Sequence, residues 1–93
     1  MERFLAIHRI PAGTTEPDFR RMLETLAQVA DEAGVDVSQT VYSLAGGQAF
    51  SLIEADNATT VRDMTARAGL PTPDVVPANV VYTELLNEPR RSR

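Results

Sequence analysis

The sequence predicts an α+β domain with the element order β-α-β-β-α-β. Three observations predict it: apolar runs of strand length open the chain and occupy its middle, two segments with helical periodicity follow capping residues, and a Gly-Gly turn joins the two middle strands. At 93 residues with 43% hydrophobic content, the chain is long enough for one small core. We therefore expect one domain over residues 1–86, followed by a flexible basic tail over 87–93.

The first half of the chain predicts a strand, a helix and a second strand. Arg3 to Ile10 carries apolar residues on both parities, which is typical of a central strand. Thr15 is the expected N-cap of a helix over residues 16–33, because acidic residues fill the first turn and apolar residues recur at helical spacing behind it. Gly34 ends this helix. Residues 35–44 then form the second predicted strand.

A hairpin leads into the third predicted strand. Gly46 and Gly47 permit the positive φ angles of a tight turn, and the run Ala49 to Asp56 follows directly. This run is apolar on both parities until it reaches Glu54. It therefore belongs in the middle of a sheet, beside the first strand.

The last part of the chain predicts a second helix and a fourth strand. Asp56 or Asn57 caps the helix, and Gly69 stops it. Residues 69–77 are rich in proline and predict an ordered connection. Asn79 to Leu86 carries valine or leucine on both parities and predicts the last strand.

This element order predicts a specific topology. Right-handed crossovers place both helices on one face of a four-stranded antiparallel sheet in the order 4-1-3-2, the ferredoxin-like arrangement. We expect the first and third strands to be parallel neighbours, so that His8 and Glu54 meet at one edge. Because two helices cover only one face, the other apolar face predicts an interface. A sheet-to-sheet homodimer, the dimeric α+β barrel, would bury it.

Composition and charge exclude several classes of protein. The chain has no cysteine, which excludes disulfides and thiolate metal sites and favours a cytoplasmic location. No apolar run is long enough for a signal peptide or a membrane span. The net charge is −4, and residues 1–87 hold six arginines against twelve acids. Neither nucleic acid nor a membrane is therefore expected as a partner.

Two ionisable residues are the candidate catalytic and metal-binding groups. His8, the only histidine, could ligate a metal or act as a general acid or base, because its unperturbed pKa lies near neutrality. The alternative is a strand-end histidine hydrogen-bonded to a neighbouring carbonyl or carboxylate. Glu54 could pair with His8, or it could pair with an arginine such as Arg9.

Four aromatic residues are candidates for a ligand pocket. Phe4, Tyr42, Phe50 and Tyr82 could enclose a small aromatic or polyketide-like molecule, to which the tyrosines would offer hydroxyl groups. The alternative is that the tyrosines are strand and interface residues without a ligand.

The sequence also resembles a family of small bacterial ferredoxin-like domains of unknown function, some of which bind nickel. The runs FLAIHRIPAGTT, AFSLIEAD and ARAGLPTPDVV carry the resemblance. The matching positions are Phe4, His8, Phe50, Glu54, Ala55, Gly69 and Pro71. Two positions depart from the nickel-associated members, because Leu70 stands where they have a histidine and Ser51 where they commonly have a cysteine.

Three classes of function follow from these residues and from the resemblance. The first is a homodimer that binds a small ligand or a divalent transition metal such as nickel, with His8 and Glu54 as metal ligands. The second is a cofactor-independent enzyme of the cyclase, isomerase or monooxygenase type, in which the same two residues move protons. The third is an accessory protein without chemistry.

Overall fold

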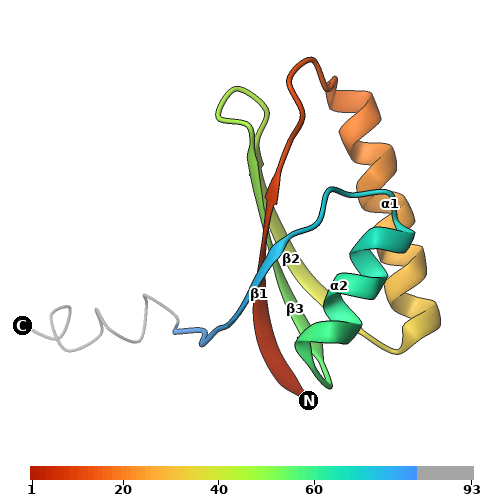
Figure 1. Ribbon diagram of the computed structural model, residues 1–93, viewed down its shortest axis with the longest axis vertical. Helices are drawn as coiled ribbons and strands as arrows, with labels where there is room; N and C mark the ends of the chain where they lie inside the picture. The colour runs from red at the N-terminus through yellow and green to blue at the C-terminus, as the bar shows by residue number, and fades with distance from the viewer. Residues whose placement is uncertain (82–93) are drawn as a thin grey trace, which may run out of the picture.

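The protein is a single antiparallel sheet with two helices packed on one of its faces (Figure 1). The computed structural model describes residues 1–81. The elements are β1 (Glu2–Arg9), α1 (Glu16–Ala33), β2 (Asp36–Ser43), β3 (Gln48–Ala55), α2 (Ala58–Arg67) and β4 (Asp74–Pro77). The strand order β2-β3-β1-β4 is the predicted order counted from the opposite edge. The α+β class and the ferredoxin-like arrangement are therefore confirmed.

Both helices begin and end as their capping residues predict. The Thr15 side chain accepts a hydrogen bond from the Asp18 amide at 3.3 Å, and Gly34 closes α1 in the left-handed conformation with φ of 68°. At the start of α2, the Asn57 side chain accepts a hydrogen bond from the Thr60 amide at 2.8 Å. Asn57, one of the two predicted candidates, is therefore the N-cap of α2.

The relative direction of β1 and β3 differs from the prediction. The two strands are neighbours, but they run antiparallel, with His8 opposite Ala49 and Arg3 opposite Glu54. The crossover through α1 makes β1 parallel to β2, and the hairpin then reverses the chain, so β3 must oppose β1. The prediction of parallel neighbours was wrong because it omitted this reversal.

The fourth strand also lies elsewhere in the chain. Asp74–Pro77, part of the predicted proline-rich connection, pairs antiparallel with β1, whereas residues 79–81 form no strand. Prolines are compatible with this position because β4 is an edge strand, where one side of the backbone needs no partner. The rest of the predicted strand and the predicted tail over 87–93 lie outside the described residues.

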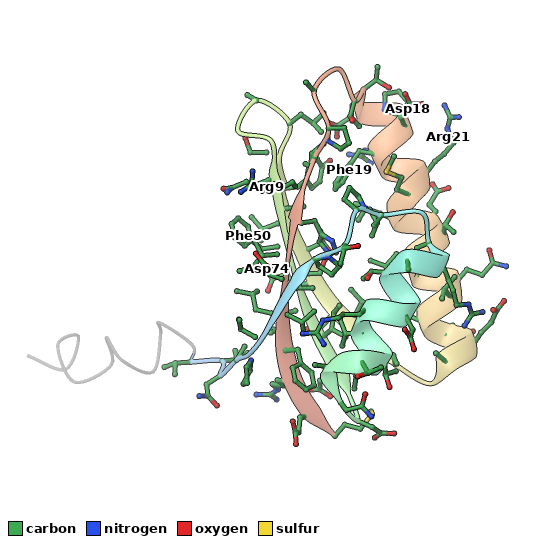
Figure 2. The ribbon with its side chains drawn as sticks, in the orientation of Figure 1. Arg9, Asp18, Phe19, Arg21, Phe50 and Asp74 are labelled. Carbon is green, nitrogen blue, oxygen red and sulfur yellow. The ribbon has the colours of Figure 1, made fainter. Side chains whose placement is uncertain are left out.

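The sheet has one covered face and one open face. On β1, Phe4, Ala6 and His8 are buried against the helices, whereas Leu5 and Ile7 alternate with them on the opposite side and are only half-buried. Phe19 of α1 fills the space between sheet and helices (Figure 2). Among the described residues, neither helix is long and apolar enough to cross a membrane.

Candidate functional site

His8 lies in the core and not at an open edge. Its side chain is 2% exposed on the helix-covered face, and it shares a row with Ala49 of β3 and Tyr42 of β2. Within the described residues, neither ring nitrogen has a hydrogen-bond partner. A buried polar group without a partner costs about 1–3 kcal/mol of stability, so the imidazole of His8 destabilises this core.

The surroundings of His8 favour the neutral form of its ring. Burial removes water from the imidazole and lowers its pKa, and the nearby Pro71 carbonyl partly offsets this by favouring the protonated ring. The carbonyl nevertheless makes no hydrogen bond of normal geometry with either nitrogen. Because the imidazole is only 2% exposed, it does not contact a substrate in this structure.

His8 and Glu54 are not neighbours, which corrects the predicted pair. They lie toward opposite ends of the antiparallel strands and on opposite faces, because His8 is opposite Ala49 whereas Glu54 is opposite Arg3. The Arg3 Nε donates to the Glu54 carboxylate at 2.9 Å. Glu54 therefore has the arginine partner that was the alternative interpretation, although the arginine is Arg3 and not Arg9.

The four aromatic candidates do not form one pocket. Phe4 and Tyr42 share the covered face, but four residues of strand separate their rows, or about 13 Å. Phe50 lies on the open face, beside Ile7. Tyr82 lies outside the described residues.

Tyr42 instead belongs to a contact between β2 and α1. Its ring centroid lies 4.7 Å from that of Phe19, and its hydroxyl donates to the Glu16 carboxylate. This hydrogen bond lowers the pKa of Glu16 and raises the pKa of Tyr42, because it stabilises the carboxylate and holds the phenol proton. Tyr42 therefore attaches the edge strand to the helix layer.

The described residues do not fit a nickel site. They include no group of three His, Cys, Asp or Glu side chains close enough to hold a metal ion. Leu70 is buried in the core, and the Ser51 hydroxyl lies 3.0 Å from the Thr40 hydroxyl, so neither replaces the missing nitrogen or sulfur ligand.

This arrangement predicts weak nickel binding. We expect calorimetric titration of the metal-free protein with Ni²⁺ to show no tight, stoichiometric binding, because His8 is enclosed and Glu54 is paired with Arg3. Titration of His8→Ala provides the control and is expected to give the same result. Tight binding that is lost in His8→Ala would mean that the core opens to admit the metal.

A groove on the open face is a further candidate site. It has a volume of about 340 Å³. Its floor is formed by apolar side chains from the three long strands, and one wall is formed by the chain beyond β4. The lining residues are Leu5, Gln39, Val41, Phe50, Leu52 and residues 78–81.

A second cavity continues this groove toward one end of the sheet. It has a volume of about 280 Å³ and shares Gln39, Leu52 and Val80 with the groove, while the Arg3–Glu54 ion pair lines its far end. The open face therefore combines an apolar floor with one charged end. The name open-face groove is used below for both cavities.

A β-bulge in β2 supplies part of this groove. The pairing of β2 with β3 shifts between Val37 and Gln39, so that Ser38 has no partner residue. Because of this extra residue, Val37 is opposite Ile53 on the covered face, whereas Val41 is opposite Phe50 on the open face and is 58% exposed. Simple alternation predicts the same face for both valines and therefore misses Val41.

The fold and the groove define the class of this protein as a small ferredoxin-like α+β domain with one uncovered apolar sheet face. No protein-family model matches the sequence, and no curated protein matches it either.

Solved structures show the same fold. The structure of SCO4226 from Streptomyces coelicolor A3(2) superposes with a TM-score of 0.74 at 21% identity, covering 86% of this chain and 99% of that one. The P2 domain of the chemotaxis kinase CheA from Thermotoga maritima, solved in complex with the response regulator CheY, gives a TM-score of 0.56 at 10% identity, covering 83% and 98%. At these identities, the similarity concerns the fold alone.

Proposed function

We propose that this protein acts as a homodimer that holds a small apolar ligand between its two sheets. The observation that carries the proposal is the open-face groove. Its main part, about 340 Å³, lies within the usual range of roughly 300–1,000 Å³ for ligand sites. Its lining is mostly apolar, with the amides of Gln39 and Asn79 as the few polar groups that could orient a ligand.

A second copy of the chain is the partner that best fits the open face. Val41 and Val76 are 58% and 41% exposed there, and the half-buried Leu5, Ile7 and Phe50 lie between them. Figure 2 shows Phe50 on the side of the sheet away from the helices. Packing this face against an equivalent face would remove a contiguous apolar surface from water.

The apolar rows favour one arrangement of the two copies. If the two-fold axis lies between the sheets and along the strands, each β1 faces β3 of the second copy at the same height. Ile7 then faces Phe50 of the second copy, and Leu5 faces Leu52, because these residues are already opposite each other within one sheet. Aligned packing of this kind is usual for two sheets, which lie about 10 Å apart.

The charges at the sheet ends favour the same axis. With the axis along the strands, Arg3 faces Glu54 of the second copy, and the two ion pairs form an alternating set of four charges. With the axis across the strands and level with Ala6, Arg3 would instead face Arg9 of the second copy. Like charges at an interface are unfavourable, so we favour the first arrangement.

The second candidate is a cofactor-independent enzyme at the same groove. It is favoured by the carboxylate of Glu54, which lines the far cavity and could accept a proton from a bound substrate. In that case, Glu54→Gln should abolish turnover and preserve ligand binding. For a binding protein, the same variant should preserve folding and binding of an apolar ligand, and it should weaken the dimer only slightly, because exposed ion pairs contribute little.

Sedimentation equilibrium tests the dimer. The protein at micromolar concentration is expected to have twice its monomer mass of 10.2 kDa. Phe50→Asp is expected to be monomeric yet folded, because it places a carboxylate on the open face and not in the core. Gln28→Asp adds the same charge on the exposed side of α1 and should leave the dimer intact. A monomeric parent protein would contradict the proposal.

An apolar fluorescent probe tests the ligand site. We expect 8-anilinonaphthalene-1-sulfonate to bind the dimer with increased fluorescence, and we expect Leu52→Gln to weaken this binding because Leu52 lines both parts of the groove. Gln28→Asp again provides the control. Equal fluorescence from the parent protein and Leu52→Gln would show that the probe does not bind in the groove.

A further inference from the structure

The open-face groove ends at an ion pair that belongs to its floor strands. Arg3 of β1 is opposite Glu54 of β3, and the next row on the same face pairs Leu5 with Leu52. Side chains two residues apart on one face of a strand are about 7 Å apart, so the ion pair lies one step beyond the apolar floor. Leu52 lines both cavities of the groove, whereas Arg3 and Glu54 line the second one. A ligand on the floor can therefore reach the ion pair with one end.

The ion pair retains hydrogen-bonding capacity on both partners. The Arg3 Nε donates to Oε1 of Glu54 at 2.9 Å. The terminal nitrogens of the guanidinium carry further N–H donors, and Oε2 of the carboxylate is a second acceptor. Within residues 1–81, these atoms take part in no other side-chain hydrogen bond. The two side chains are 50% and 33% exposed, so the end of the groove offers a donor and an acceptor side by side.

The charges at this end of the groove cancel. An anionic head group would be attracted by Arg3 and repelled by Glu54, and a cationic head group would meet the reverse combination. A neutral group with one acceptor and one donor satisfies both side chains without an unfavourable charge. A carboxamide has this combination, because its carbonyl accepts from Arg3 while its N–H donates to Glu54. In the proposed dimer, the second copy adds one more charge of each sign, so the end of the groove stays neutral.

The rest of the groove favours an apolar body. Beyond the ion pair, Leu5, Leu52 and Phe50 form the floor, and Val80 lines both cavities. Arg9 lies at the other end of β1, on the same side of the sheet as Phe50 (Figure 2), and it lines neither of these two cavities. The charged side chains that line the groove are therefore gathered at one end.

We propose that the ligand of the open-face groove is a neutral amphiphile, with its apolar chain on the floor and a carboxamide head group bound between Arg3 and Glu54. This inference rests on the proposed function and names the class of ligand. The floor contributes affinity, and the ion pair selects the head group. An acid or an amine with the same chain binds less tightly, because each places a like charge beside one partner of the ion pair.

Titration calorimetry with three probes of equal chain length tests the head-group preference. At pH 7, octanamide is neutral, octanoate is anionic and octylamine is cationic. For the full-length parent protein, we expect octanamide to bind about threefold or more tighter than either charged probe. Ratios of dissociation constants within one protein are the readout, because a small change in dimer stability affects all three probes equally.

Removing one charge at a time should shift the preference in opposite directions. Glu54→Gln leaves Arg3 unopposed, so the dissociation constant of octanoate should fall roughly tenfold relative to that of octylamine. Arg3→Gln should raise the same ratio by a similar factor. The ion pair between Arg67 and Glu32 joins the two helices, with side chains 57% and 56% exposed. Arg67→Gln and Glu32→Gln therefore make the same charge changes away from the groove and should leave the ratio unchanged.

The outcomes separate this inference from the proposed function. If neither 8-anilinonaphthalene-1-sulfonate nor any octyl probe binds the parent protein, the ligand site and the inference are both wrong. If the fluorescent probe binds but octanamide is not preferred, or if the ratio is equal in Glu54→Gln and Arg3→Gln, the inference is overturned and the ligand site stands. Equal shifts in the helix variants would show that net charge determines the preference, which overturns it too. Preference for octanamide, with opposite shifts confined to the groove variants, supports it.

Discussion

Replacing Phe19 with alanine is expected to lower the free energy of unfolding by about 3–5 kcal/mol. Phe19 is 2% exposed, it connects α1 to the sheet, and its ring lies 4.7 Å from that of Tyr42. The substitution removes this contact and leaves a cavity between two rigid layers, which relax only partly. Chemical denaturation at a fixed protein concentration measures the change.

A matched substitution on the same helix provides the control. Leu23→Ala removes a half-buried side chain and should cost clearly less than Phe19→Ala. Equal losses in the two variants would show that α1 does not pack on the sheet through Phe19.

The replacement of His8 by leucine is expected to raise the free energy of unfolding at pH 7 by about 1–3 kcal/mol. The imidazole is buried with both nitrogens unpartnered, and leucine fills a similar volume without polar atoms. A loss of more than about 1 kcal/mol would instead show that the contact with the Pro71 carbonyl stabilises the fold.

The His8→Leu variant should also remove a pH dependence of the free energy of unfolding. Burial lowers the pKa of His8 in the folded state, so below pH 6.5, its ordinary value, the unfolded chain binds more protons than the folded one. Stability should therefore fall as the pH drops from 7 to 5, by at most about 1.4 kcal/mol per pH unit. His8 is the only histidine, so His8→Leu should flatten this slope. If stability depended on pH equally in His8→Leu and in the parent protein, His8 would not be the source of this dependence.

Local signals in the sequence predicted most of the fold. Thr15, Gly34 and Asn57 determine where the helices begin and end, because each satisfies backbone groups that a helix end leaves free. The apolar parities of β1 and β3 indicated central strands, and the strand order follows from the crossovers. The capping residues and the apolar parities depend only on residues close together in the sequence, so they can be recognised without a structure.

The candidate site could not be predicted in the same way. Whether His8 meets Glu54 depends on the direction in which β3 pairs with β1, which is a property of the whole topology and not of either segment. The chain has two segments that could pair with β1 as the last strand, residues 74–77 and 79–86. In the structure, Asp74–Pro77 forms β4, although it contains a proline. The sequence offered no signal for the bulge at Ser38, since a serine there is compatible with a regular strand.

The bulge at Ser38 divides β2 into two parts, one facing the core and one facing the groove, whose side chains can be substituted separately. On one side of Ser38, Val37 belongs to the core, whereas beyond it Gln39 and Val41 belong to the groove. Sequence alignment with a relative that has a regular strand here would need a one-residue gap at Ser38; without it, groove positions would be matched to core positions. For protein engineering, the same division means that Gln39 and Val41 can be varied to change the lining of the groove while the packing around Val37 is preserved.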